Sequence, residues 1–333
     1  MNWLLTGGCG FIGRNLIRVL TPKEGNYIRV VDNLSTGSKE DLADICTFSE
    51  CSAISHPKLG KVDFHQLDIL DEKAATKVAE NIDVIVHLAA NTGVSPSVEN
   101  PRYDCLNNVV GTLNYLEAAR RNMVKRFVFA SSGAPAGECE PPIHEELPPH
   151  PVSPYGASKL AGEGYCSAYY RTYSIETVAL RFSNVYGPLS TRKDSVVAKF
   201  IKQILEGHEL EIYGDGAQSR DFIYIDDLIK AILLSAVQPQ VGGETFQIAT
   251  SNETTVGELL KLVKDLFKER KWHREINVRY TEPRIGDVKR NFSDTSKALS
   301  LLGWKAETEI EVGLNKTIDW FLKQEAEQLY PTV

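Results

Sequence analysis

Residues 4–13 read LLTGGCGFIG, a short apolar run followed at once by glycines and then by an apolar pattern with helical spacing. Gly7, Gly10 and Gly13 form G-x-x-G-x-x-G, a variant of the dinucleotide-binding fingerprint. Glycines at a strand-to-helix turn let backbone N–H groups approach a pyrophosphate at the helix N-terminus. The stretch therefore predicts a nucleotide-binding strand-loop-helix unit, in which Phe11 and Ile12 belong to the cofactor-binding residues.

The same organisation continues outward from this unit through the first half of the chain. Further short apolar runs, separated by segments with helical spacing, are expected as strands at 28–32, 62–65, 84–88, 127–130 and 177–181. They show little polar alternation, which is typical of strands buried on both faces. Strand-helix alternation predicts an α/β fold with a doubly wound parallel (Rossmann) sheet.

The pattern loosens after residue 187. We predict a cofactor-binding domain over 1–187 and a smaller, mainly substrate-binding α/β part over 188–333, with segments near 220–250 returning to the main sheet. Helices are expected at 196–205, 255–268 and 312–324, a strand at 211–213, and loops at 44–60 and 141–154.

Composition excludes several classes of protein. The 333 residues carry a formal net charge of -7 with no basic block, which argues against a nucleic-acid partner. No apolar run approaches the ~20 residues that span a bilayer, and no signal-peptide apolar region precedes the glycines. The six Cys include no CxxC pair, so we expect reduced thiols in a cytoplasmic protein.

Asp32 ends the second predicted strand, at the distance from the glycines where an acidic residue binds ribose. Its carboxylate can accept from both adenosine ribose hydroxyls and would repel a 2′-phosphate, so it favours NAD over NADP. Asn33 follows it directly. Asp68 and Ile69, after the third strand, are expected at the adenine edge, with a solvated turn as the alternative for Asp68.

Residues 153–159 read SPYGASK and predict a helix start, with Ser153 as N-cap and a proline as the first helical residue. Tyr155 and Lys159 stand four residues apart, so they share one face of that helix. A phenol titrates near ~10, and a nearby ammonium lowers this pKa. YxxxK by itself is common on surface helices, but together with Ser132 and the glycine loop it predicts a proton-transfer set for hydride chemistry.

Taken in order, the segments GGCGFIG, VVDNLSTG, HLAA, NNVVGTLNYLEAAR, FVFASS, YGASK, RFSNVYGP, RDFIYIDDL and RIGDV resemble extended short-chain dehydrogenase/reductases of the NAD-dependent epimerase/dehydratase group. The resemblance runs nearly end to end. It implies that Tyr155 is the catalytic base, that Lys159 binds the nicotinamide ribose and lowers the Tyr155 pKa, and that Ser132 hydrogen-bonds the reacting hydroxyl.

The resemblance also implies positions that contact ligands. It assigns cofactor contacts to Leu88, Ala89 and Asn107, and contacts to a nucleotide diphosphate to Asn184, Arg220, Arg284 and Asp287. Solvated surface cations are the alternative for the two arginines. The family often reads S-S-x-x-V-Y-G after the fifth strand, whereas Ala136 replaces the aromatic residue here. Helices through 113–119 and through Tyr155 resemble those that pair in homodimers of the family.

The implied chemistry begins with Tyr155, which takes a proton from a sugar hydroxyl while hydride leaves the same carbon for NAD. Related dehydratases carry an Asp-Glu pair beside the Ser/Thr, but Gly133 and Ala134 follow Ser132 in this chain. Elimination therefore has no evident acid. We expect 4-epimerisation of a UDP-hexose (UDP-glucose/UDP-galactose) through a 4-keto sugar.

Several alternatives stay open at this point. Asn291, at a position that often limits bulk at sugar C2, is compatible with UDP-N-acetylhexosamines, and Arg192 lies one residue from a carboxylate-binding position of UDP-glucuronate 4-epimerases. A dehydratase, a plain NAD-dependent dehydrogenase and a non-catalytic NAD-binding regulator are the others.

We expect His87 to be a buried structural histidine. No metal site is expected from Cys46, Cys51 and His56, which lack a fourth ligand, and the offset of Cys139 does not fit an acid-base role.

Overall fold

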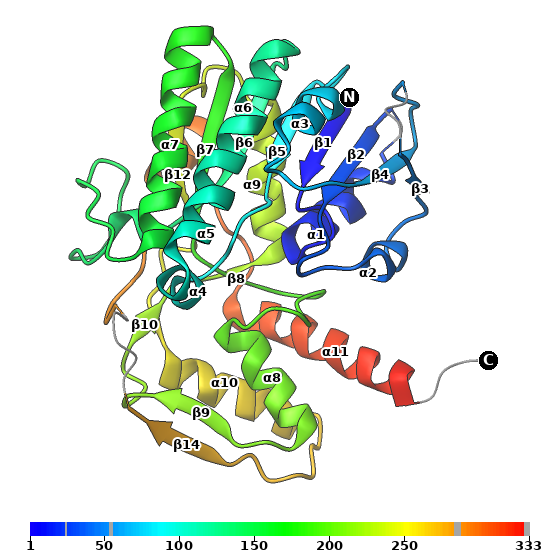
Figure 1. Ribbon diagram of the computed structural model, residues 1–333. Coiled ribbons are helices and arrows are strands. Elements are labelled where there is room, and N and C mark those ends of the chain that lie inside the picture. Colours follow the sequence, from blue (N-terminus) through cyan, green and yellow to red (C-terminus); the bar gives the residue numbers. More distant parts are fainter. Residues whose placement is uncertain (24, 53–55, 283–287, 330–333) are drawn as a thin grey trace.

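The computed structural model describes residues 1–23, 25–52, 56–282 and 288–329 (Figure 1). Its main sheet has eight strands in the order β12-β7-β6-β5-β1-β2-β4-β3, and every neighbouring pair is parallel. The strands are β1 (Asn2–Thr6), β2 (Tyr27–Asp32), β3 (Ser49–Glu50), β4 (Val62–Gln66), β5 (Val84–His87), β6 (Arg126–Ser132), β7 (Glu176–Phe182) and β12 (Glu244–Ile248). The predicted α/β class and doubly wound sheet are confirmed.

Helices cover both faces of this sheet (Figure 1). One face carries α3 (Glu72–Val78), α6 (Gly111–Arg121) and α7 (Pro154–Tyr173), and the other carries α1 (Phe11–Leu20) and α9 (Ile225–Val237). The position of β5 between the two layers of helices explains why its sequence is apolar without interruption. Val84 and Val86 belong to the core on the α1/α9 side, whereas Ile85 belongs to the core on the α6 side.

The strand order reverses direction between β1 and β5. From β1 the chain first runs outward through β2 and β4, and it then returns to place β5 on the other side of β1. Ligands of doubly wound sheets bind beyond the carboxyl ends of the strands at such a switch point. The glycine loop follows β1 at this place, and residues 88–89 follow β5 beside it.

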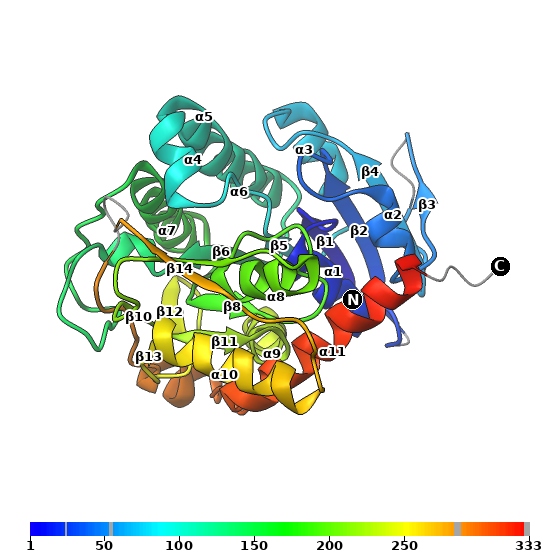
Figure 2. The same cartoon turned by 90° about the horizontal axis from the view of Figure 1, so that it is seen from below.

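A smaller lobe lies beyond the carboxyl edge of the main sheet (Figures 1 and 2). It contains three two-stranded pairings, β8 with β11, β9 with β14 and β10 with β13. Its strands are β8 (Asn184–Tyr186), β9 (Leu210–Tyr213), β10 (Ser219–Arg220), β11 (Phe222–Tyr224), β13 (Thr254–Thr255) and β14 (Val278–Thr281), and its helices are α8 (Val196–Glu206), α10 (Val256–Glu269) and α11 (Ile310–Leu329). This lobe lies next to the carboxyl edge of the main sheet, where ligands of such sheets bind.

Some elements were not expected from the sequence. The 44–60 loop contains β3, which extends the sheet beyond β4, because two residues in register with Asp63 and Phe64 are enough to pair. The remaining elements are α2 (Lys39–Ala43), α4 (Val94–Glu99), α5 (Pro101–Cys105), the π-helical turns η1 (Leu106–Val110) and η3 (Ala298–Leu302) and the 3₁₀ turn η2 (Ala134–Ala136). Strand β12 pairs with β7 in the main sheet, and the division of the chain near residue 187 stays a prediction. Within the described ranges, no helix combines the length and apolarity that crossing a membrane requires.

Candidate active site

The glycine loop brings backbone atoms of β1, α1 and the segment after β5 into close contact. Gly7 has a φ of +69°, and a Cβ added there would lie 2.7 Å from the backbone N of Ala89. Helix α1 begins after Gly10 without a capping side chain. Its first N–H groups are therefore free to bind an anion, and the missing side chains leave room for a diphosphate. These residues fit a dinucleotide.

We expect a Gly7→Ala variant to contain much less bound NAD than the wild type, and to melt several degrees lower. The left-handed backbone costs a non-glycine residue roughly 1–2 kcal/mol, and the new methyl group would also press on Ala89. Absorbance of the denatured protein at 260 nm against 280 nm measures the cofactor. Gly60→Ala is the matched control, because Gly60 shares the positive φ but faces open space. Equal NAD contents in the two variants would contradict the expectation.

Asp32 closes the cofactor loop from the end of β2. Its Oδ2 accepts a hydrogen bond from the N–H of Cys9 at 2.9 Å, and its Oδ1 accepts one from the N–H of Leu34 at 2.8 Å. Burial raises the pKa of this carboxyl above its usual value, and the two hydrogen bonds only partly oppose the rise. Asn33 donates to Asp68 Oδ2 at 3.1 Å, so the residues expected around the adenosine lie together at one edge.

Tyr155 lies at the start of α7, where the local sequence sets up the helix. The Ser153 side chain accepts a hydrogen bond from the N–H of Gly156 at 3.1 Å, and Pro154 occupies the first turn. Ser132, the last residue of β6, hydrogen-bonds the Tyr155 hydroxyl. Burial raises the pKa of Tyr155 to about 12, and the Ser132 hydrogen bond opposes this rise.

Lys159 lies one turn further along α7 and is 4% exposed. Its Nζ donates to the carbonyl oxygen of Ala130 at 2.9 Å and lies 5.9 Å from the centroid of the Tyr155 ring. Burial lowers the pKa of Lys159 to about 8, against the raising effect of the Asp104 and Glu163 carboxylates. Among the protein groups, the hydrogen bond with Ser132 lowers the Tyr155 pKa, and the lowering expected from Lys159 stays a prediction.

A buried polar cluster supports this helix and was not anticipated from the sequence. Asn108 Nδ2 donates to Asp104 Oδ1 at 2.9 Å and to Ser158 Oγ at 3.1 Å, and Asn108 also bonds the backbone of Asn91. Ser158 in turn donates to the carbonyl oxygen of Tyr155 at 3.0 Å. Asn107, expected near the cofactor, instead donates to the carbonyl oxygen of a residue one turn earlier. Asn108 is the Asn of NNVVGT that contacts α7, and the cofactor contact expected of Asn107 stays a prediction.

Asp104→Asn is expected to shift the alkaline limb of the kcat/KM pH profile to lower pH. Asp104 raises the pKa of Lys159, so its neutralisation lets the ammonium lose its proton at a lower pH. Glu163 is the other charged group acting on Lys159, and Tyr155 and the neutral His87 lie beside it. At pH 9 the variant should lose about fivefold in kcat/KM. The control is Glu99→Gln, which neutralises an exposed acid at the end of α4. If the wild type, Asp104→Asn and Glu99→Gln had the same kcat/KM pH profile, the expectation would be refuted.

A buried ion pair lies behind Ser132. Glu163 and Arg181 are joined by two hydrogen bonds of 2.9 and 2.8 Å, and Ser131 Oγ donates to Glu163 Oε1 at 2.5 Å. Glu163 stands four residues after Lys159, so helical spacing could have identified it. Together with Ser131, the pair joins α7 to β6 and β7 next to Ser132 and Lys159. Burial raises the pKa of the nearby Cys139 thiol, which is consistent with a lining position.

The expected diphosphate-binding residues come from the smaller lobe. Asn184 begins β8 and pairs in register with Phe222. Arg220 donates from one nitrogen to the carbonyl oxygens of Ser219 at 2.6 Å and Val288 at 2.8 Å. Arg284 and Asp287 lie outside the described residues, so their expected roles stay predictions.

Two further expected positions are buried. His87 shares a hydrogen bond of 2.9 Å between its Nδ1 and Thr6 Oγ1, and burial lowers its pKa to about 3, so the ring is neutral. Its other nitrogen has no partner among the described residues. Ala136, which replaces the family's aromatic residue, lies buried in η2, where its carbonyl oxygen accepts from the N–H of His150.

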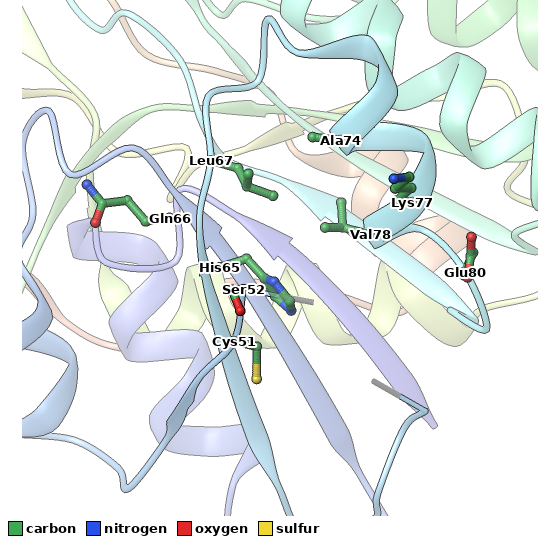
Figure 3. A pocket seen from close by; sticks show the side chains of 9 residues that line it. All are labelled: Cys51, Ser52, His65, Gln66, Leu67, Ala74, Lys77, Val78 and Glu80. Atoms are coloured by element: carbon green, nitrogen blue, oxygen red, sulfur yellow. The ribbon is translucent and has the colours of Figure 1, made fainter. Parts of the chain in front are cut away.

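A pocket of about 580 Å³ lies away from these residues, between β4 and α3 (Figure 3). Cys51, Ser52 and His65 approach one another on its β4 side, and Lys77 and Val78 line it from α3. Burial lowers the pKa of His65. In the part of the chain that the structure describes, no three His, Cys, Asp or Glu side chains are grouped closely enough to hold a metal ion. We therefore assign the chemistry to the carboxyl edge of the sheet.

A glycine loop at the switch point of a parallel sheet, with Ser132, Tyr155 and Lys159 at the same edge, defines an enzyme of the short-chain dehydrogenase/reductase class that uses a nicotinamide dinucleotide. A family model described as the NAD dependent epimerase/dehydratase family matches residues 3–249, and the chain belongs to this family. NAD is accordingly its cofactor, as expected from Asp32.

Known relatives agree with this placement over nearly their whole length. The chain is 34% identical to the UDP-glucose 4-epimerase of Mycolicibacterium smegmatis over 96% of this chain and 98% of the relative. Among solved structures, the UDP-glucose 4-epimerase of Thermotoga maritima with UDP-glucose has a TM-score of 0.86 at 36% identity, covering 98% and 100% of the two chains. The UDP-glucuronic acid 4-epimerase of Bacillus cereus, in complex with UDP-glucuronic acid and NAD, has a TM-score of 0.87 at 29% identity, covering 99% and 100%.

Proposed function

We propose that this protein catalyses the NAD-dependent 4-epimerisation of a UDP-hexose, interconverting UDP-glucose and UDP-galactose, and thus acts in galactose metabolism. The observation that carries the proposal is the Ser132–Tyr155 hydrogen bond beside Lys159, with no acid at the next two positions. A Tyr base next to Ser removes a proton from a sugar hydroxyl, and elimination of water would need a further acid. The 4-epimerases among the relatives support the same reaction.

The residues then act in the following way. NAD, when bound, accepts and returns the hydride and brings a positively charged nicotinamide ring. Tyr155 Oη removes the proton from the sugar 4-hydroxyl, and the Ser132 hydrogen bond stabilises the phenolate. Lys159, held by Ala130, carries the positive charge beneath the Tyr155 ring. After the 4-keto sugar has turned over, Tyr155 returns the proton, so one stereocentre is inverted.

The UDP-glucuronate alternative is disfavoured by the position of Arg192. Its Nε donates to Asp41 Oδ2 at 2.7 Å, so the guanidinium is paired with α2 on the cofactor side of the cleft. A carboxylate-bearing sugar would have to displace this pair, which costs about 1 kcal/mol or less because Arg192 is 51% exposed. UDP-N-acetylhexosamines stay the second candidate, since one structural neighbour is the UDP-N-acetylglucosamine 4-epimerase of Methanobrevibacter ruminantium.

Incubation of the purified protein with UDP-galactose is expected to yield UDP-glucose at equilibrium without added NAD. The measurement is chromatographic separation of the two sugar nucleotides. Parallel kcat/KM values for UDP-N-acetylgalactosamine and UDP-galacturonate rank the sugars, and we expect UDP-galactose to be first. Absence of any UDP-glucose, with and without NAD, would refute the proposed reaction.

We further infer that the protein is a homodimer. Tyr103, Leu106 and Val110 lie at helical spacing along α5 and η1 and are each at least 37% exposed. Beside them, α7 exposes the small residues Ala157 and Gly164, which permit close approach of another helix. A second copy of the chain that presents the same surface would cover the exposed apolar residues of α5 and η1 and the small residues of α7. Light scattering is expected to give twice the chain mass, and Leu106→Glu should give a monomer; a wild-type monomer would refute the inference.

A cytoplasmic location stays part of the proposal. All six cysteines are free, as expected for a chain that folds under reducing conditions. Fractionation of the source cells with an antibody against the protein tests it, with recovery in the cytoplasmic fraction as the expected result. Recovery in a membrane or secreted fraction would contradict it.

A further inference from the structure

A row of polar side chains on α7 contacts the end of β6. Its three members are spaced four residues apart, and each makes a hydrogen bond to one of the last three residues of β6: Tyr155 with Ser132, Lys159 with the carbonyl oxygen of Ala130 at 2.9 Å, and Glu163 with Ser131 Oγ at 2.5 Å. This spacing places the side chains along one face of the helix. The row therefore fixes the register of α7, that is, where the helix lies along β6. Only Tyr155 and Lys159 take part in the proposed reaction.

Glu163 is held by more contacts than the other two members of the row. Arg181 donates to both of its carboxylate oxygens, at 2.9 and 2.8 Å, and the Ser131 hydroxyl donates to one of them. Ser131 and Arg181 are register partners in the parallel pair of β6 and β7, so two neighbouring strands hold the carboxylate at the same level. We call Glu163 with these two partners the carboxylate clamp. Because Ser131 directly precedes Ser132, the clamp lies one residue from the group that bonds Tyr155.

The stability of the fold does not explain an ion pair at this place. Both charged members are almost fully buried, and each loses its hydration at a cost of several kcal/mol. Well-packed apolar residues of similar volume often give the same stability or more. The clamp adds a defined geometry, because its hydrogen bonds are directional and charge-assisted. We propose that Glu163 is a positioning residue, which through the clamp sets the register of α7 on β6 and holds Tyr155 against Ser132.

This inference rests on the proposed function, because it concerns the base of that reaction. The Ser132 hydrogen bond lowers the pKa of Tyr155, whereas burial and the Asp104 carboxylate raise it. Lys159 is the other charged group beside the ring, at 5.9 Å from its centroid, and the nearby His87 is neutral. A shift of α7 along β6 weakens the Ser132 bond, since hydrogen bonds depend steeply on distance and angle. The pKa of Tyr155 then rises, and less phenolate is present at neutral pH.

The test variant is Ser131→Ala in the full-length protein, because it removes one hydrogen bond of the clamp and leaves Glu163 paired with Arg181. We expect the acidic limb of the kcat/KM pH profile to move up by about one pH unit, since the base must lose its proton to act. At neutral pH kcat should fall about fivefold, with KM and the NAD content unchanged. Above the shifted limb the variant should regain most of the wild-type rate, whereas a purely structural defect lowers the rate at every pH.

Two further variants serve as comparisons. Ser131→Thr keeps the hydroxyl donor and should restore the wild-type pH profile. Ser235→Ala removes a hydroxyl that is equally buried but lies in α9, on the opposite face of the sheet, and has no partner among the described residues; its profile should match the wild type. Ultraviolet titration of the tyrosines, compared with the same proteins carrying Tyr155→Phe, measures the Tyr155 pKa without turnover.

An unchanged pH profile and an unchanged Tyr155 pKa in Ser131→Ala would overturn the proposal. If that variant fails to fold, the triple variant Ser131→Ala/Glu163→Met/Arg181→Met replaces the whole clamp by apolar side chains. It should show the same upward shift of the acidic limb, and an unshifted limb overturns the proposal instead. A wild-type protein that does not convert UDP-galactose would refute the proposed reaction alone, because the tyrosine titration still tests the register.

Discussion

Tyr155→Phe is expected to lower kcat for UDP-galactose by about 10³-fold while NAD remains bound. The phenol is the group placed to remove the proton from the sugar hydroxyl, and phenylalanine keeps its ring but cannot hold a proton. Ser132 would lose a hydrogen-bond partner. Lys159 keeps its bond to Ala130, so the cofactor side of the site should be unaffected.

Steady-state epimerase assays and the NAD content of the purified variant measure this effect. Tyr173→Phe, near the exposed end of the same helix, is the matched control and should retain wild-type turnover. If Tyr155→Phe retained more than about a tenth of wild-type kcat, another group would have to be the base. A variant that lost NAD together with turnover would instead indicate a binding defect.

Arg181→Met is expected to lower the free energy of unfolding by about 3–5 kcal/mol, because it leaves the Glu163 carboxylate buried without its cation. Both side chains are almost fully buried, with 5% and 6% exposed, and two short hydrogen bonds join them. A chain of this size should then melt roughly 4–7 °C lower. Calorimetry or thermal denaturation followed by circular dichroism measures the change.

Two comparisons separate this cause from a general packing loss. The double variant Glu163→Gln/Arg181→Met should recover at least half of the lost stability, because the introduced glutamine is neutral and can still accept from Ser131. Arg120→Met breaks an exposed pair with Glu117 of similar geometry and should cost less than about 1 kcal/mol. Additive losses in the double variant would show that the buried charge is not the cause.

Much of the fold could be predicted because its signals are local. The glycine loop, the uninterrupted apolar strands and the Ser153-Pro154 helix start each act within a few residues, and all three form as expected. The pairing of β3 escaped prediction, since two exposed residues carry no hydrophobic pattern. The expected contacts of Arg284 and Asp287 lie outside the described residues, and the other ligand contacts stay predictions.

The site could be predicted only as far as its motifs reach. Tyr155 and Lys159 share a face because helix geometry requires it, and Ser132 joins them because β6 ends beside α7. The choice of Asn108 over Asn107 depends on which of two adjacent side chains points towards α7. A one-residue step turns a helical side chain by about 100°, and the π-helical turn η1 changes this register.

The sequence by itself therefore determined the class of fold and the cofactor, and it predicted the glycine loop with Asp32 and the set of Ser132, Tyr155 and Lys159, because these depend on residue type and short spacing. Only the tertiary structure decided how that set is supported and charged. Asp104 reaches Lys159 from another helix, Arg181 neutralises Glu163 from a neighbouring strand, and Lys193 meets Phe11 from far along the chain. Such contacts arise from packing between distant segments, so electrostatics in the cleft depend on the folded chain.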